Sequence, residues 1–188
     1  MSQSFDIAVI GATGTVGETL VQILEERDFP VGNLHLLASS ESAGHSVPYR
    51  GKNVRVREVD EFDFSKVQLV FFAAGPAVTL SFASRATAAG CSLIDLSGAL
   101  PADQAPQVVP EANAQVLAGL TKPFQVSSPS PSATTLAVVL APLLGLLDLQ
   151  RIHLTAALAV SAQGREAVTE LARQTAELLN VRPLEPTF

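Results

Sequence analysis

The stretch Gly11-Ala12-Thr13-Gly14-Thr15-Val16-Gly17 carries three glycines, each separated from the next by two residues. Residues 5–10, an apolar run, precede it and predict a buried strand. Apolar residues at helical spacing follow: Val16, Leu20, Ile23 and Leu24. A strand, a glycine turn and an amphipathic helix in this order indicate a site for a dinucleotide. Gly11 then permits the sharp turn, Gly14 lets a pyrophosphate approach the backbone, and Gly17 lets the helix pack close to the strand. The alternative is a tight turn that binds no ligand.

The composition limits the class of protein. A chain of 188 residues can bury the core of one full domain and part of a second. Its net charge is −6 and its basic residues are scattered, which argues against a nucleic-acid partner. The N-terminus shows no signal peptide, and the most apolar run, residues 134–147, is shorter than the roughly 18 residues of a membrane span. A single cysteine excludes an internal disulfide. We therefore expect a cytoplasmic protein with no membrane partner.

Strands and helices alternate along the first part of the chain. Further strands are predicted at residues 34–38, 54–57, 68–74, 91–96 and 124–127, with helices at residues 77–88 and after residue 110. This repeat implies parallel strands covered by helices on both faces. The expected fold is therefore α/β, a Rossmann-type doubly wound parallel sheet, and we place this dinucleotide-binding domain at residues 1–130.

The pattern changes after the Pro- and Ser-rich residues 128–132. A long apolar helix is predicted there, followed by a strand at residues 151–161 and an amphipathic helix at residues 164–180. One strand and one helix cannot bury two faces unaided. Residues 131–188 are therefore expected to be the incomplete beginning of a second, α+β domain.

Five phrases now point to a known family: Gly11–Gly17, Leu37–Gly44, Phe71–Gly75, Val108–Asn113 and Ala159–Ser161. In this order they resemble the aspartate-semialdehyde dehydrogenase family over nearly the whole chain. The resemblance implies a Rossmann-type domain followed by a dimerisation domain, and hence a homodimer longer than this chain. It also implies NADP-dependent interconversion of aspartyl phosphate and aspartate semialdehyde through a cysteine thioester.

At the positions of the family's chemistry the chain departs from the family. Pro131 occupies the position of the nucleophilic cysteine. The family's substrate-orienting glutamine aligns with Leu158, its asparagine with Leu96 and its phosphate-binding arginine with Pro101. None of these side chains can make the corresponding interaction, so we assign no catalytic residue. Within the family this pattern most resembles the USG-type paralogue that lacks the catalytic cysteine.

No neighbouring group replaces the lost cysteine convincingly. Ser132 carries a hydroxyl, but the sequence shows no base paired with it. Cys91, at the start of a predicted buried strand, is expected to be a small core residue. Ser130 and Pro131 fit the N-cap and first position of the long helix. Two hypotheses follow: a family member that binds a dinucleotide without the parent reaction, or an active NAD(P)-dependent oxidoreductase acting on an aldehyde or acyl phosphate through another group.

The predicted cofactor-binding residues are Gly11, Thr13, Gly14, Thr15, Val16, Ser39 and Ser40. An NAD enzyme usually carries a carboxylate at the end of the second strand, whereas here Ser39 and Ser40 offer hydroxyls that suit a 2′-phosphate. In many relatives a basic residue comes next, but this chain has Glu41, which would repel that phosphate or bond a bare ribose. The cofactor is therefore NADP or NAD. The three histidines show no metal-ligand spacing, so no metal is expected.

Overall fold

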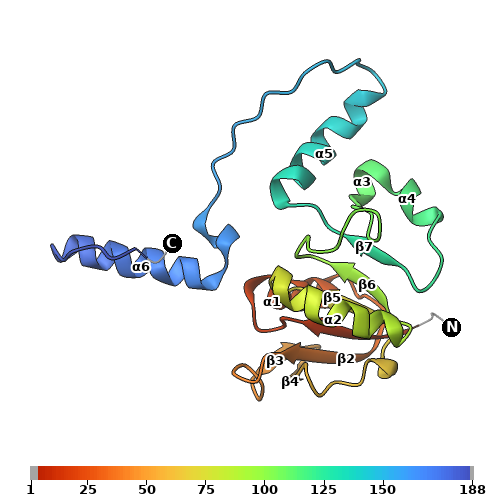
Figure 1. Cartoon of the computed structure of the whole chain (residues 1–188), viewed down its shortest axis with the longest axis horizontal. Helices are drawn as coiled ribbons and strands as arrows, with labels where there is room; N and C mark the ends of the chain where they lie inside the picture. Colours follow the sequence, from red (N-terminus) through yellow and green to blue (C-terminus); the bar gives the residue numbers. More distant parts are fainter. Residues whose placement is uncertain (1–3, 187–188) are drawn as a thin grey trace. The chain divides into compact units, whose positions relative to one another are not determined.

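The computed structural model of this chain describes residues 4–186. It divides into two compact units, residues 1–150 and 151–188, which we describe separately. Figure 1 shows the elements along the chain. Those of the first unit are β1 (Phe5–Ile10), α1 (Thr15–Glu26), β2 (Val31–Ala38), β3 (Ser46–Tyr49), β4 (Lys52–Glu58), a 3₁₀ turn (Phe64–Lys66), β5 (Leu69–Phe72), α2 (Pro76–Ala88), β6 (Ser92–Asp95), α3 (Pro110–Asn113), α4 (Gln115–Ala118), β7 (Gln125–Ser127) and α5 (Pro131–Leu144).

The first unit is built on a seven-stranded sheet in the order β3-β4-β2-β1-β5-β6-β7. The strands from β4 to β7 run parallel, with β1 paired to β2 on one side and to β5 on the other. The α/β Rossmann-type prediction is confirmed. Parallel pairing places the carboxyl ends of the strands at one edge of the sheet, where ligands of such folds bind.

One edge strand was missing from the prediction. β3 runs antiparallel to β4, with Tyr49 opposite Lys52. The turn between them uses Arg50 at φ 48° and Gly51 at φ 71°, the two positive angles that a tight hairpin favours. Pro48 lacks an N–H and is tolerated because β3 lies at the edge of the sheet.

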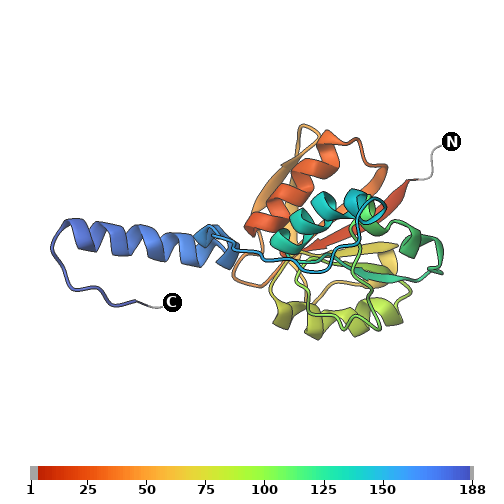
Figure 2. The same cartoon turned by 90° about the horizontal axis from the view of Figure 1, so that it is seen from above.

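Alternating side chains of the buried strands fill two cores, one on each face of the sheet. In β1, Ile7 and Val9 pack with Val21 and Leu24 of α1, whereas Ala8 and Ile10 belong to the cluster that includes α2. Figure 2 shows α1 and α2 on opposite sides of the sheet. Burial on both faces explains why the parallel strands read as nearly continuous apolar runs.

The orientation of α1 differs from the expected one. Its buried stripe is Gly17, Val21 and Leu24, while Val16 is 52% exposed and Ile23 41% exposed. The predicted apolar face, which included Val16 and Ile23, was therefore wrong at these two positions. The close contact of Gly17 with the preceding turn selects this stripe, because Gly17 is the only residue of the first turn small enough to face the sheet.

The second unit contains a 3₁₀ turn (Val160–Gln163) and α6 (Arg165–Leu179). The strand predicted at residues 151–161 is absent: residues 151–159 form neither helix nor strand and are exposed. A strand needs a partner for its backbone groups, and no segment among residues 4–186 pairs with this one. The helix predicted at residues 164–180 is confirmed as α6. None of the described helices is long and apolar enough to cross a membrane.

Candidate functional site

The turn between β1 and α1 is held by backbone contacts that leave no room for side chains at two glycines. Gly11 has φ +83°, and a Cβ there would lie 2.8 Å from the backbone of Ala73 and Ala74. A Cβ on Gly17 would lie 2.1 Å from the carbonyl oxygen of Gly11. The fold itself therefore requires glycine at both positions, whether or not a ligand binds.

Gly14 is different. It is the N-cap of α1 with φ −81° and ψ 163°, which any residue adopts, and its side-chain position meets one atom at 3.4 Å, the carbonyl oxygen of Gly11. No side chain caps α1, so the N–H groups of its first turn, from Thr15 to Gly17, have no intrahelical partner. An anion fits here, because these N–H groups and the helix dipole both favour negative charge.

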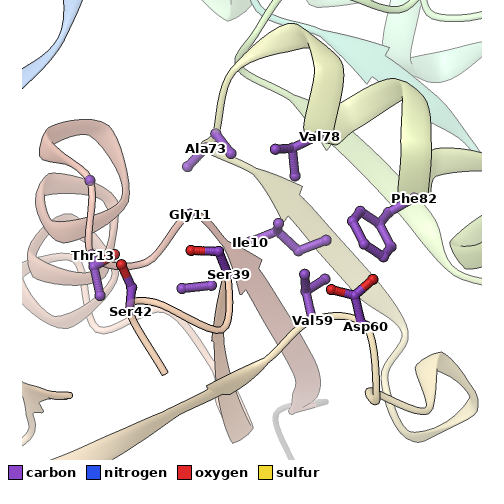
Figure 3. A pocket seen from close by; sticks show the side chains of 13 residues that line it. Ile10, Gly11, Thr13, Ser39, Ser42, Val59, Asp60, Ala73, Val78 and Phe82 are labelled. Atoms are coloured by element: carbon purple, nitrogen blue, oxygen red, sulfur yellow. The ribbon is translucent and has the colours of Figure 1, made fainter. Parts of the chain in front are cut away.

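A cavity of about 330 Å³ opens over this turn at the carboxyl edge of the sheet. We call it the glycine-turn cavity (Figure 3). Its lining residues are Ile10, Gly11, Thr13, Gly14, Ala38, Ser39, Ser42, Val59, Asp60, Ala73, Ala74, Val78 and Phe82. The cavity thus offers N–H groups to the phosphates of a nucleotide, hydroxyl groups to its ribose and apolar side chains to its base.

The structure brings together four of the seven predicted cofactor residues: Gly11, Thr13, Gly14 and Ser39. The side chains of Thr15, Val16 and Ser40 do not line the cavity. Ser40 and Glu41 are exposed. The roles of all seven toward a cofactor stay predictions.

Sequence reasoning missed the opposite wall of the cavity. Val59 and Asp60 follow β4, and Val78 and Phe82 come from α2. The Val59 N–H donates to the carbonyl oxygen of Ala38 at 3.0 Å, which holds Asp60 near the end of β2. No local motif marks these residues, because only the pairing of β4 with β2 brings them to the glycine turn.

A second cavity, of about 440 Å³, lies at the N-terminus of α5, and we call it the α5 cavity. Its lining residues are Leu96, Ser97, Gly98, Gln107, Ser128, Pro129, Ser130, Pro131 and Ala133. Ser130 is the N-cap of α5, its Oγ accepting from the Ala133 N–H at 3.3 Å, and Pro131 is the first helical residue. Both structural roles predicted for these residues are confirmed.

Of the positions at which we expected a departure from the family pattern, Leu96 and Pro131 lie together in the α5 cavity. Pro101 does not line it, and Leu158 belongs to the second unit. Ser132 is also absent from the lining, and no base pairs with its hydroxyl among the described residues.

The turn after β6, which forms one wall of the α5 cavity, is organised by a fully buried carboxylate. Asp95 accepts from the Ser97 N–H at 2.8 Å, the Ser97 hydroxyl at 2.6 Å and the Leu100 N–H at 3.0 Å. Thr79 in α2 lies 2.9 Å from the Ser97 hydroxyl. With its oxygens engaged in this way, Asp95 shapes the turn rather than facing the cavity.

The only cysteine of the chain lies in the core. Cys91 is fully buried, and its Sγ lies 3.2 Å from the Phe64 carbonyl oxygen and 3.3 Å from that of Val67. Burial raises the pKa of the Cys91 thiol above its ordinary value. Its predicted role as a core residue is confirmed, and it lines neither cavity.

Comparison with known proteins places both parts of the chain. Residues 6–120 match the semialdehyde dehydrogenase NAD-binding domain, and residues 140–188 match the dimerisation domain of the same enzymes. A USG-1 protein homolog from Azotobacter vinelandii is 60% identical over 188 residues, which are 100% of this chain and 56% of the relative. A USG-1 protein homolog from Pseudomonas aeruginosa is 58% identical over 186 residues, 99% of this chain and 55% of that protein.

A solved structure agrees with these relatives. The structure of a probable aspartate-semialdehyde dehydrogenase from Pseudomonas aeruginosa superposes with a TM-score of 0.93 at 58% identity, covering 98% of this chain and 55% of that one. The chain thus spans about half the length of the relatives it matches.

Proposed function

The chain belongs to the aspartate-semialdehyde dehydrogenase family, and on that premise we propose that it binds a nicotinamide dinucleotide in the glycine-turn cavity without the parent thioester reaction. The observation that carries this proposal is the contrast between the two cavities. The glycine turn offers N–H groups without an intrahelical partner and space at Gly14 for a pyrophosphate, whereas Pro131, at the position where the resemblance implies the family's cysteine, lines the α5 cavity.

Each part of the glycine-turn cavity has a place in dinucleotide binding. The N–H groups of the first turn of α1 would hold the pyrophosphate, and Gly14 leaves space for its approach. Val59, Val78 and Phe82 would supply apolar surface for the adenine ring. A bound nicotinamide would be the group able to accept or donate hydride.

The parent reaction needs a thiolate close to the substrate, and the described chain offers none. Cys91 is buried with a raised pKa, so it supplies neither access nor thiolate. Loss of a covalent nucleophile costs several orders of magnitude in rate. The alternative, an oxidoreductase that uses another group, gains no support from Ser132, because no base among residues 4–186 pairs with its hydroxyl.

Two measurements test the proposal. Calorimetry should detect binding of NAD or NADP to the purified protein, and Gly14→Val should abolish it while the fold survives, because φ −81° suits valine. An assay of aldehyde-dependent NAD(P)H formation in the presence of phosphate should show no turnover. A turnover near one per second that a mutation in the α5 cavity abolishes would establish the active alternative. If neither dinucleotide binds at millimolar concentration, the glycine turn serves only the packing of α1 on the sheet, and the proposal is wrong.

We also propose that the protein dimerises through its second domain, which we place at residues 131–188. Several large apolar side chains around residues 146–158 are exposed, among them Leu146 at 80% and Leu158 at 65%. Such surface favours contact with another chain. Light scattering on the 188-residue chain should reveal self-association, and a stable monomer at tens of micromolar would contradict it.

A further inference from the structure

Within the part of the chain that the structure describes, the glycine-turn cavity carries one charged side chain, and it is negative. Asp60 is the only ionisable residue among residues 4–186 that lines the cavity, and none of the lysines, arginines and histidines in that range does so. Its carboxylate has no hydrogen-bond or ion-pair partner within residues 4–186. In Figure 3 it stands on the side of the cavity away from the glycine turn, with Val59 and Phe82.

The position of Asp60 follows from strand pairing. β4 runs parallel to β2 with Glu58 beside Ala38, and the Val59 N–H donates to the Ala38 carbonyl oxygen at 3.0 Å. Asp60 therefore leaves β4 next to the point where Ser39 leaves β2. In dinucleotide-binding folds the end of the second strand is where a carboxylate meets the adenosine ribose.

The end of β2 itself provides no such carboxylate to the cavity. Ser39 lines it, but Ser40 and Glu41 do not, and Glu41 is exposed. A 2′-phosphate at this place would find hydroxyls from Ser39 and Ser42 but no cation to neutralise it.

Arg85 is a cation that contacts this segment, and its guanidinium is already engaged. Its guanidinium donates to the carbonyl oxygen of Asp60 at 2.8 Å and to that of Phe62, and it lies 5.3 Å from the centre of the Phe64 ring. Arg85 does not line the cavity. It positions the backbone of Asp60 rather than offering a partner to a phosphate.

We propose that Asp60 acts as the ribose carboxylate of this site: it accepts a hydrogen bond from the adenosine 2′-hydroxyl of NAD, and its charge disfavours the 2′-phosphate of NADP. This inference rests on the proposed dinucleotide binding and adds the choice between the two cofactors. It assigns the specificity to a residue after β4 instead of one after β2.

Calorimetry with NAD and with NADP tests the proposal. The purified protein should bind NAD at least about tenfold more tightly than NADP, because the Asp60 carboxylate accepts a hydrogen bond from the 2′-hydroxyl of NAD and repels the 2′-phosphate of NADP. Asp60→Asn should weaken the binding of NAD. It should strengthen the binding of NADP by roughly two- to fivefold, because one screened repulsion is lost, and the ratio of the two affinities should therefore fall. Raising the salt concentration should also lower the ratio of NAD to NADP affinity of the unmodified protein, because salt screens the repulsion.

Glu61→Gln is the matched control, since Glu61 is the next residue, is exposed and lines a different part of the surface. It removes the same charge and should change the ratio less than twofold. NADP binding as tightly as NAD overturns the inference but leaves dinucleotide binding intact. An unchanged ratio in Asp60→Asn overturns the role of Asp60. Failure of both cofactors to bind overturns the proposed function itself.

Discussion

The two cavities lie at the same edge of one sheet, yet they differ in what holds their walls. The glycine-turn cavity depends on backbone packed so closely that Gly11 and Gly17 admit no side chain. The α5 cavity is the larger of the two, about 440 Å³ against 330 Å³, and is shaped by a capped helix and the turn that Asp95 organises. Its shape therefore depends on hydrogen bonds in its walls rather than on the side chain at position 131. The difference teaches that one edge of a sheet can hold two cavities whose walls are fixed in different ways, one by close backbone packing and one by side-chain hydrogen bonds.

The largest effect is expected at Gly17. Gly17→Ala should lower the free energy of unfolding by about 3 kcal/mol, because the added Cβ lies 2.1 Å from the Gly11 carbonyl oxygen and only backbone movement relieves the clash. Urea unfolding measures this loss. Gly14→Ala is the control, and with a single neighbour at 3.4 Å it should cost no more than about 1 kcal/mol. Equal losses in the two variants would remove the distinction between the glycines.

A smaller effect is expected at the cap of α5. Ser130→Ala removes the acceptor of the Ala133 N–H and should destabilise the first turn of α5 by about 1 kcal/mol or less, since the bond is 3.3 Å long. Hydrogen exchange at the first-turn amides detects the change. Ser128→Ala is the control, because Ser128 lines the same cavity but does not cap the helix. This variant should leave the hydrogen exchange of these amides unchanged. If both variants behave alike, the cap does not hold this wall.

The smallest effect is expected from placing a thiol at position 131, where the resemblance to the family implies a cysteine. Pro131→Cys should give no turnover in the aldehyde assay, because Leu96 still lines the cavity where the resemblance implies a polar group. A thiol reagent should nevertheless modify one cysteine in the variant, since position 131 is exposed at a helix N-terminus, and none in the unmodified protein, whose Cys91 is buried. Measurable turnover would show that a thiol at position 131 is sufficient for the reaction.

Local patterns predicted most of the fold. The buried strands are short apolar runs that pack on both faces, so their position in the sequence follows from composition alone. The hairpin of β3 and β4 was missed because its turn, Arg50-Gly51, has a positive φ at Arg50. Residues other than glycine rarely adopt this conformation, so the turn was not predicted. The strand expected at residues 151–161 is absent for a different reason. The alternation of apolar and polar residues is a local signal, whereas the backbone hydrogen bonds of a strand require a partner strand.

The candidate site divides in the same way. Gly11, Gly14 and Thr13 were predictable because they are contiguous and stand between a strand and a helix. Asp60 was not, because it reaches the cavity only through the pairing of β4 with β2. Long-range register of this kind leaves no mark in a single sequence.

The close packing at Gly11 and Gly17 has a consequence for how related sequences are compared. A descendant that had stopped binding any dinucleotide would still retain both glycines, since replacing either disturbs the backbone. The fold places no such constraint on Gly14. A glycine kept at this middle position in related sequences is therefore the informative one for dinucleotide binding, whereas glycines at the outer two positions indicate only that the fold is kept.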